Sequence, residues 1–296
     1  MSSSDEAVVI WGEVLWDRFP EGDQLGGAPA NVAYHLGQAG GWARLVSRVG
    51  NDELGKRALE RLGAYVDTSL IQVDAERPTG EVGVSIEAGE PRYTLHADRA
   101  WERIACTPST ATAIAEAGVL IFGTLSQRTG EGLAGWRQAI AAATDTCLKV
   151  CDINLRRVPG LPATPEVREA LDAADVIKVN DRELGILAGW YGWADPIAAL
   201  RASTKVLAVT HGAGGSTLYG DAAPIHIPGV HARPGGDNVG CGDAYLAILV
   251  LGMTMGWDLS ASGHAASRYA AAVAEARGAT PMFDDARIAE LLGDDE

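Results

Sequence analysis

A glycine-rich run that ends in an acid, Gly240-Cys241-Gly242-Asp243, is the segment of the sequence best suited to chemistry. The apolar stretch 244–253 follows it, so the run predicts a loop that enters a helix, where free N–H groups and the helix dipole favour an anion. The segment therefore suits phosphoryl transfer, with Asp243 as an ionised base and the backbone of Gly240, Cys241 and Gly242 around the anion. Taken alone, a glycine turn before a helix-favouring acid explains the segment equally well.

A second cluster lies near the start of the chain, where Gly26 and Gly27 precede Asn31. The glycines permit a ligand to approach the backbone closely, and the Asn31 amide can cap the following helix or bind a ligand hydroxyl. Glu13 and Asp17 come just after the first expected strand, at the sheet edge where α/β proteins bind ligands. Carboxylates accept hydrogen bonds from polyol hydroxyls, so the cluster suits a sugar. A capped turn beside surface acids is the competing interpretation.

Three further strand ends carry polar residues. Asn180 and Glu183 have the spacing to hold a hydrated Mg²⁺ through water, although a capping box explains that spacing fully. Thr210, Gly212 and Gly215 form a glycine turn that can face a nucleotide, or else an ordinary hairpin turn. The third strand end offers Asp152, Asn154 and Arg156 to the same edge of the sheet.

The composition excludes several classes of protein. Of the 296 residues, 47 % are hydrophobic and 21 % charged, as in a globular protein with a full core. The formal net charge of −15 repels phosphate backbones, and no cluster of Lys and Arg is long enough to bind nucleic acid. The four cysteines lack zinc-site spacing, the N-terminus lacks a signal peptide, and no apolar run is long enough to span a bilayer. We expect a cytoplasmic protein with reduced thiols, without nucleic-acid or membrane partners.

Short β-branched runs alternate with amphipathic stretches, which predicts a parallel sheet with helices on both faces. Residues 13–27 and 79–97 break this rhythm, and the second segment alternates apolar and polar side chains as a half-exposed hairpin does. A small flap that closes on a substrate is the simplest account, and a surface hairpin without a role is the alternative. The expected strands are 7–11, 44–49, 119–122, 148–151, 176–179 and 206–209, and the expected helices include 31–38, 54–62, 132–143 and 165–173.

One segment, Gly50 to Arg57, nearly matches the P-loop pattern and follows an expected strand. Arg57 replaces the hydroxyl residue that should bind Mg²⁺, and acids occupy the place where phosphate would lie. A P-loop NTPase is therefore a rival hypothesis in which Lys56 would be essential.

Taken together and in order, these motifs resemble those of the PfkB, or ribokinase-like, carbohydrate kinases. The similarity extends from Val8 to Thr280, nearly the whole chain. The segments that carry it are Gly26-Gly27-x-x-x-Asn31 and Asp237-Asn238-Val239-Gly240-Cys241-Gly242-Asp243-Ala244, similar to the two family signatures, with Asn180-x-x-Glu183 and Thr210-x-Gly212-x-x-Gly215, similar to its Mg²⁺/phosphate motif and nucleotide turn.

The resemblance implies a ribokinase-like three-layer α/β/α core of residues 1–12, 32–78 and 98–296, with a mostly parallel sheet. It implies a small β-stranded substrate lid of residues 13–31 and 79–97, through which family members often form homodimers. ATP would be the phosphoryl donor and Mg²⁺ its ion, and the loop of Asp237 would hold the K⁺ that activates some members. The implied sugar contacts are Asp17, Gly26, Gly27, Asn31 and Arg156, the implied nucleotide contacts are Asn180, Thr210, Gly212 and Gly215, and Glu183 would hold Mg²⁺ through water.

Within the family, the segments 12–17 and 152–156 look most like the fructokinase branch, which phosphorylates the 6-hydroxyl of fructose. Ribokinase and 2-keto-3-deoxygluconate kinase are alternatives, and the latter would need cations such as Arg99, Arg103 and Arg156. A non-catalytic sugar or nucleotide sensor is the alternative outside catalysis. Two residues depart from the family pattern, Asn238 in place of Thr and Cys241 in place of Ala, and the thiol would add an oxidation site beside the chemistry.

Overall fold

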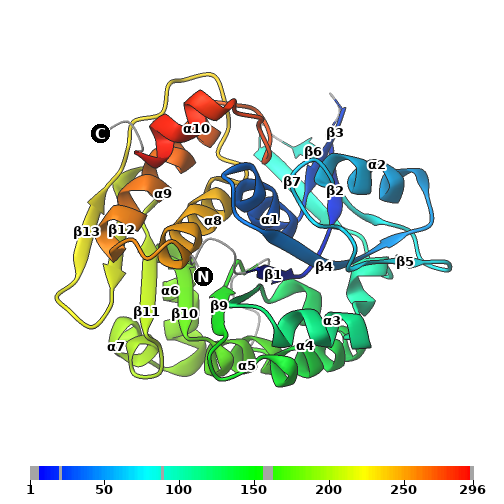
Figure 1. Ribbon diagram of the computed structural model, residues 1–296, viewed down its shortest axis with the longest axis horizontal. Helices are drawn as coiled ribbons and strands as arrows, with labels where there is room; N and C mark the ends of the chain where they lie inside the picture. The colour runs from blue at the N-terminus through cyan, green and yellow to red at the C-terminus, as the bar shows by residue number, and fades with distance from the viewer. Residues whose placement is uncertain (1–6, 20–21, 88–89, 156–162, 294–296) are drawn as a thin grey trace.

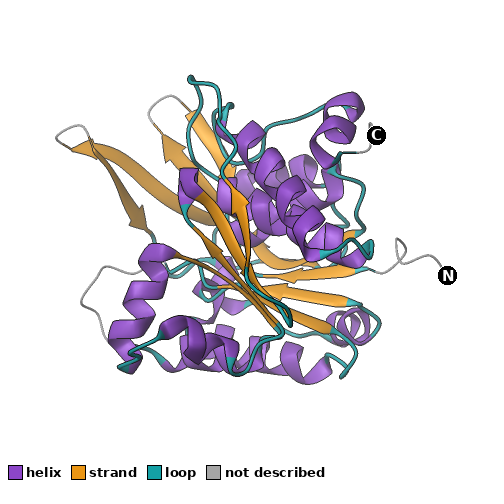
Figure 2. Ribbon diagram, turned by 90° about the vertical axis from the view of Figure 1, so that its left-hand side faces the viewer, coloured by secondary structure: helices purple, strands orange, loops and turns teal. Residues whose placement is uncertain are grey.

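The structure is a computed structural model that describes residues 7–19, 22–87, 90–155 and 163–293. A large sheet runs through the molecule between two layers of helices, and a smaller sheet lies beside it near α2 (Figures 1 and 2). No helix in these residue ranges is both long and apolar enough to cross a membrane. All four cysteines are free thiols.

The elements alternate as the sequence predicts, with several additions. The large sheet consists of β1 (Val8–Trp11), β4 (Ala43–Gly50), β5 (Ile71–Asp74), β8 (Val119–Phe122), β9 (Leu148–Asp152), β10 (Val176–Asn180), β11 (Val206–Thr210), β12 (Gly215–Tyr219) and β13 (Ile225–Pro228). The small sheet consists of β2 (Leu15–Phe19), β3 (Gly22–Gly26), β6 (Gly80–Glu87) and β7 (Glu90–Leu95). The α-helices are α1 (Ala28–Gln38), α2 (Glu53–Leu62), α3 (Pro108–Ala115), α4 (Gly130–Ala142), α5 (Pro165–Ala173), α6 (Asp181–Tyr191), α7 (Pro196–Arg201), α8 (Cys241–Thr254), α9 (Leu259–Ala274) and α10 (Asp285–Leu292).

The large sheet has the strand order β13-β12-β11-β10-β9-β8-β1-β4-β5. In this sheet the strands β11, β10, β9, β8, β1, β4 and β5 are parallel. β12 and β13 extend the sheet as an antiparallel edge. The predicted α/β core with a mostly parallel sheet is confirmed. The parallel register aligns Lys178 with Asp152 and Asn180 with Thr210, so the polar residues at these strand ends are neighbours.

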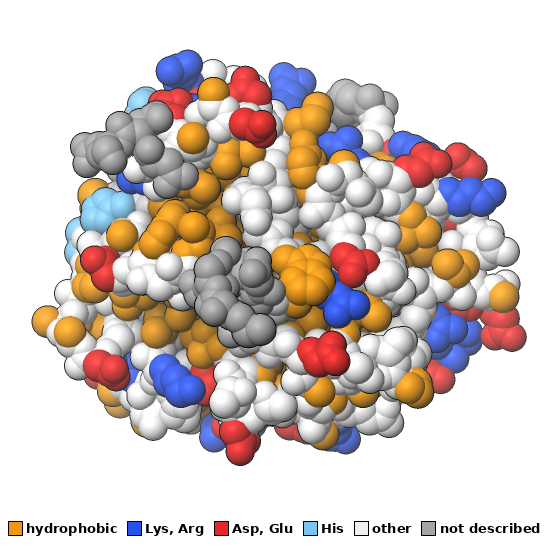
Figure 3. Space-filling view, in the orientation of Figure 1, with side chains coloured by type: hydrophobic (Ala, Val, Ile, Leu, Met, Phe, Trp, Pro, Cys, Tyr) orange, Lys and Arg blue, Asp and Glu red, His pale blue; other side chains and the backbone are white. Residues whose placement is uncertain are grey.

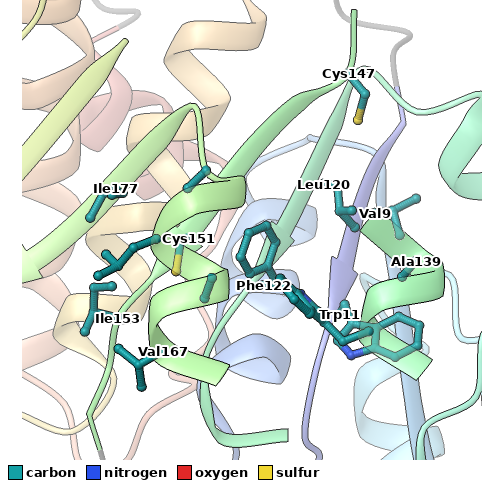
Figure 4. Packing of buried hydrophobic residues seen from close by; sticks show 14 of the residues in the cluster. Val9, Trp11, Leu120, Phe122, Ala139, Cys147, Cys151, Ile153, Val167 and Ile177 are labelled. Carbon is teal, nitrogen blue, oxygen red and sulfur yellow. The ribbon is translucent and has the colours of Figure 1, made fainter. Parts of the chain in front are cut away.

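Alternate residues of the central strands face opposite helical layers. Val9 and Trp11 pack with α3, α4 and α5, whereas Val8 and Ile10 pack with α1, α2 and α8. Figure 4 shows residues of the first of these clusters, among them Trp11 and Phe122, which are paired in register on neighbouring strands. Both faces of a parallel sheet are therefore buried, as its continuous apolar strands require. On the face seen in Figure 3, hydrophobic side chains gather near the middle and charged ones lie mainly around the rim.

The small sheet has the order β3-β2-β6-β7, in which β6 and β7 form the predicted antiparallel hairpin. The segment 13–27, which breaks the α/β rhythm and which the resemblance placed in the β-stranded lid, supplies the β2–β3 hairpin, and β2 pairs with β6 in parallel. Four passages of chain connect this sheet to the core: 12–14, residue 27, 75–79 and 96–99. The sheet is therefore one unit assembled from two parts of the sequence.

A buried histidine joins α1 to the segment that follows α9. His35 is fully buried, and its Nε2 lies 2.8 Å from the carbonyl oxygen of Ala279, to which it donates because a carbonyl only accepts. Three residues further along α1, Gln38 donates to Tyr269 Oη and accepts a hydrogen bond from the N–H of Phe283. Burial lowers the pKa of His35 to about 4, so this histidine is neutral at physiological pH.

This histidine makes folding stability depend on pH. Between its ordinary pKa of 6.5 and the folded value of about 4, the unfolded chain binds a proton that the folded chain excludes. Stability is therefore lost as the pH falls through this window, by roughly 3 kcal/mol from this group. We expect urea unfolding at pH 7 and pH 4 to show a smaller loss for His35→Gln than for the wild type. Equal losses in the two proteins would contradict the assignment.

Candidate active site

The predicted catalytic segment lies where the loop after β13 enters α8. Gly240 precedes this helix with φ 77°, a left-handed conformation that disfavours other residues. A side chain there would also collide with Ala279, whose Cα would lie 2.7 Å from the added Cβ. Asp243 lies in the first turn and is only 7 % exposed. The backbone of Gly240 to Asp243 therefore forms the open N-terminus of a helix, which can bind an anion.

The two signature-like segments meet at Asp243. Asn31 Nδ2 donates a hydrogen bond of 2.7 Å to Asp243 Oδ2, and both residues are buried. Asn31 does not cap the helix, as one interpretation of the sequence held, because α1 begins at Ala28 with Gly27 in the capping position. Asn31 Oδ1 is also buried and has no hydrogen-bond partner among the described residues. A ligand hydroxyl beside Asp243 would satisfy this acceptor.

Lys178, which is not among the residues predicted from the sequence, supplies a positive charge beside this helix. Its ammonium lies 2.8 Å from Asp152 Oδ1, and it would lie 3.3 Å from a Cβ placed on Gly242. Burial alone would lower the pKa of Lys178, but three neighbouring carboxylates outweigh it and the pKa is raised. These carboxylates belong to Asp152, Glu183 and Asp243. The available signal was a lysine inside the apolar run 176–179, which must find a partner when the strand is buried.

The capping-box interpretation of Asn180 and Glu183 is the arrangement that the structure contains. Asn180 Oδ1 accepts from the N–H of Glu183, and Glu183 Oε2 accepts from the N–H of Asn180. The other carboxylate oxygen, Oε1, accepts a hydrogen bond of 2.7 Å from the N–H of Leu155. Burial raises the pKa of Glu183, an effect that the Lys178 ammonium opposes. Backbone N–H groups thus fix the orientation of the Glu183 carboxylate near the Lys178 ammonium.

The residues near Lys178 fit a magnesium ion whose ligands are mainly water and the phosphates of a substrate. Among the described residues, no three His, Cys, Asp or Glu side chains are grouped to hold a metal. Mg²⁺ commonly keeps several waters and binds substrate phosphates with only one or two carboxylates. Asp152 Oδ2 is buried without a hydrogen-bond partner in the described part of the chain, and Glu183 lies in the same cluster. Together they offer acceptors for metal-bound water.

The turn after β11 forms an ordinary hairpin, which was the alternative to a nucleotide-facing glycine turn. β11 and β12 are antiparallel, and a short 3₁₀ turn, Gly212–Gly214, connects them. Thr210 is paired in register with Asn180 at the end of β10. Next to it, His211 bridges Asp181 and Thr217, at 2.8 and 2.9 Å. The hairpin does not exclude a nucleotide, because the ends of β10 and β11 still adjoin.

The predicted sugar contacts lie on the small sheet and at the start of α1. Asp17 in β2 is half-buried, and its Oδ2 would lie 2.5 Å from a Cβ at Gly26. Gly27 has φ 102°, and any side chain there would collide with the carbonyl oxygen of Glu13. A pocket of about 10 Å³, room for one water, lies at the nearby ends of β1, β8 and β9. Its polar lining comes from Glu13, Thr124, Asp152 and Asn154, of which Thr124 was not selected from the sequence.

Asp237 fastens the loop before α8. Its Oδ1 accepts from the N–H of Val239 and its Oδ2 from the N–H of Gly278, both at 3.0 Å. The monovalent-cation role stays a prediction, since these bonds give Asp237 a structural role of its own. Burial raises the pKa of Cys241 to about 11, so its thiol is protonated. Cys241 is therefore a poor site for the oxidation that its position suggested.

The remaining candidates are the three arginines considered as cations for a sugar acid. Arg99 forms an ion pair with Glu81, and Arg103 pairs with Asp98 and Glu131, so neither cation is uncommitted. Arg156 falls outside the described residues.

The P-loop-like segment is closed by its own acid. The Asp52 carboxylate accepts hydrogen bonds from the N–H of Gly55 and of Thr79. It therefore occupies the helix N-terminus where a P-loop would bind phosphate.

Comparison with known proteins identifies the family of this chain. The sequence profile described as pfkB family carbohydrate kinase matches residues 22–286. The chain belongs to the pfkB family. It is therefore a sugar kinase, an enzyme that transfers a phosphoryl group.

Individual pfkB relatives are distant but similar over most of their length. The uncharacterized sugar kinase PH1459 of Pyrococcus horikoshii is 28 % identical over 269 residues, which cover 88 % of this chain and 84 % of the other. A crystal structure of PH1459 matches with a TM-score of 0.81 over 96 % of this chain and 97 % of that one, and PH1459 has also been solved with ATP. Fructokinase-2 of Solanum lycopersicum is 29 % identical over 272 residues, 84 % of this chain and 82 % of the other.

A fructokinase of Vibrio cholerae O395, solved as a double mutant with fructose, ADP and potassium ion, matches with a TM-score of 0.83. The match covers 99 % of this chain and 100 % of that one at 23 % identity, and it shows the shared fold.

Lys178 and Asp152 provide a test of the buried charge cluster. Lys178→Met leaves the Asp152 carboxylate buried without its partner, which costs about 3–5 kcal/mol in comparable pairs. We expect urea unfolding to show a loss of this order for the single variant and a clearly smaller loss for Lys178→Met/Asp152→Asn. If the double variant were as unstable as the single one, the ion pair would not be the source of the effect.

Proposed function

We propose that this pfkB enzyme transfers the γ-phosphoryl group of ATP to a primary hydroxyl of a small sugar, namely the 6-hydroxyl of fructose. The observation that carries the proposal is the buried contact of 2.7 Å between Asn31 and Asp243 at the start of α8. It joins an acid suited to accept a proton with an amide that still has one buried acceptor, Oδ1. A sugar hydroxyl at this point would meet both groups.

In the proposed reaction, Asp243 accepts the proton of the sugar hydroxyl as its oxygen bonds to the γ-phosphorus. The bond from that phosphorus to the oxygen shared with the β-phosphate breaks, and ADP leaves. The Asn31 amide fixes the orientation of the Asp243 carboxylate through its hydrogen bond. The N–H groups at the start of α8 donate to the phosphoryl oxygens, and the Lys178 ammonium beside Gly242 adds positive charge.

ATP would extend from the start of α8 towards the ends of β10 and β11, where Asn180, Thr210, Gly212 and Gly215 are the proposed nucleotide contacts. Mg²⁺, when bound, would neutralise phosphate charge. Asp152 and Glu183 would hold its water ligands, since Asp152 Oδ2 is buried without a hydrogen-bond partner among the described residues and Glu183 is oriented by backbone N–H groups.

Two observations favour fructose over 2-keto-3-deoxygluconate. Relatives named fructokinase align over most of the chain, and Arg99 and Arg103, two of the three arginines that could bind a sugar acid, are already ion-paired. Asp17, Gly26 and Gly27 would contact the sugar from the small sheet, which would act as the lid. A homodimer through this sheet stays a prediction, for which sedimentation equilibrium is the direct test.

The base is tested by Asp243→Asn, which keeps the size of the side chain but removes its ability to accept a proton. We expect kcat to fall by about 10²–10⁴, the usual contribution of a general base, while calorimetry still shows binding of ATP and sugar. Near-normal turnover in this variant would refute the assignment.

The acceptor is identified by ADP release with fructose, ribose, 2-keto-3-deoxygluconate and adenosine, each with and without K⁺. Turnover with fructose well above the others supports the proposal. Binding of sugar without any ADP release would instead favour a sensor. Lys56→Ala serves as the matched control, because it should leave turnover unchanged unless the P-loop-like segment binds ATP.

A further inference from the structure

A cleft of about 570 Å³ lies between the edge strand of the small sheet, α2 and the segment that follows α9. The described residues that line it do not include Asp243, Asn31 or Lys178. Its volume falls within the range of roughly 300–1,000 Å³ that is typical of small-molecule sites. The cleft is thus large enough for a ligand and separate from the side chains that form the proposed catalytic centre.

Three arginines line this cleft from two sides. Arg57 and Arg61 are one turn apart on α2, so they share a face, and Arg277 comes from the segment after α9. Arg277 has no hydrogen bond or ion pair to any other residue that the structure describes. Arg61 directs one nitrogen, Nη2, to the carbonyl and hydroxyl oxygens of Thr280, at 3.1 and 3.2 Å. Each guanidinium has five N–H donors, so these contacts leave most of them available.

The guanidinium of Arg57 is held in place but only weakly neutralised. It lies over the Trp16 ring at 4.5 Å from the centroid, and its Nη1 is 3.3 Å from Asp23. Asp23 forms a shorter ion pair of 2.6 Å with Arg18, so its charge is shared between two arginines. Glu60 is the other acid in the lining, which leaves three arginines against two acids. A cationic cleft on a protein of net charge −15 is a specific place for an anion.

We propose that this cleft binds a small phosphorylated metabolite as an effector, at a site distinct from the active site. Guanidinium groups match phosphate oxygens in paired hydrogen bonds, and the volume leaves room for more than a phosphate group alone.

A ligand in the cleft would touch the segment that shapes the start of α8. Arg61 binds Thr280, the neighbouring Ala279 packs behind Gly240, and the N–H of Gly278 is bonded to Asp237. The same ligand would contact β3 of the small sheet. Binding there would therefore change the turnover of the kinase as well as its stability.

The test uses inorganic phosphate and fructose 6-phosphate as probes in calorimetric titrations of the full chain, with and without saturating AMP-PNP. We expect a saturable event that persists with AMP-PNP, which occupies the place of the transferred phosphoryl group and so prevents either probe from binding in the active site. The double variant Arg57→Gln/Arg277→Gln should weaken it by about tenfold or more, as expected for lost charge-assisted hydrogen bonds. Arg168→Gln, which changes an exposed arginine of α5 outside the cleft, should leave it unchanged. Tighter binding of fructose 6-phosphate would identify a sugar phosphate, and equal affinities would identify the phosphate group as the recognised part.

The proposal is overturned by absence of saturable binding, by loss of binding when AMP-PNP is present, or by wild-type affinity in the double variant. Because Arg57 packs on Trp16, Arg277→Gln alone provides a second test in which that packing is kept. Turnover without the probes should be normal in both variants, so failure of the effector site is distinguishable from failure of the kinase assignment.

Discussion

The buried ammonium of Lys178 is the constraint around which the catalytic edge of the sheet is organised. A charge in this position must be compensated, and its compensation comes from β9, α6 and α8 at once. Asp152, Glu183 and Asp243 would repel one another without it. The ammonium therefore holds together three elements that are distant in sequence, and it lies next to the helix N-terminus that we propose binds the oxygens of the transferred phosphoryl group.

The segment after α9 is the second feature that fixes the geometry of the candidate site. His35 and Gln38 bond it to α1, Asp237 bonds it to the loop before α8, and Ala279 closes the space behind Gly240. Asn31 comes from the same helix as His35, one turn earlier. The position of the Asp243 carboxylate and the shape of the backbone before it are consequently set by one helix, α1.

The sequence was sufficient for features that depend on local patterns. The central strands follow from apolar runs, the β6–β7 hairpin from alternation, and the position of Asp243 from a glycine turn before an apolar helix. The contacts that give the site its geometry are long-range and leave no local signal. Asn31 and Asp243 are 212 positions apart, and the capping role considered for Asn31 failed because Gly27 already begins the helix. Lys178 was not predicted as a site residue because its ion-pair partner, Asp152, lies on β9. The sequence alone does not show that β9 lies beside β10.

The way the small sheet is attached has a mechanical consequence. Four separate passages of chain tie it to the core, so it lacks the freedom of a loop fixed at two points. If the sheet acts as the proposed lid, its motion would be a tilt about the line of these tethers, with few internal degrees of freedom. Closure of such a lid would then cost little conformational entropy. In that case Asp17 would move as part of one rigid sheet and would return to one orientation in every catalytic cycle.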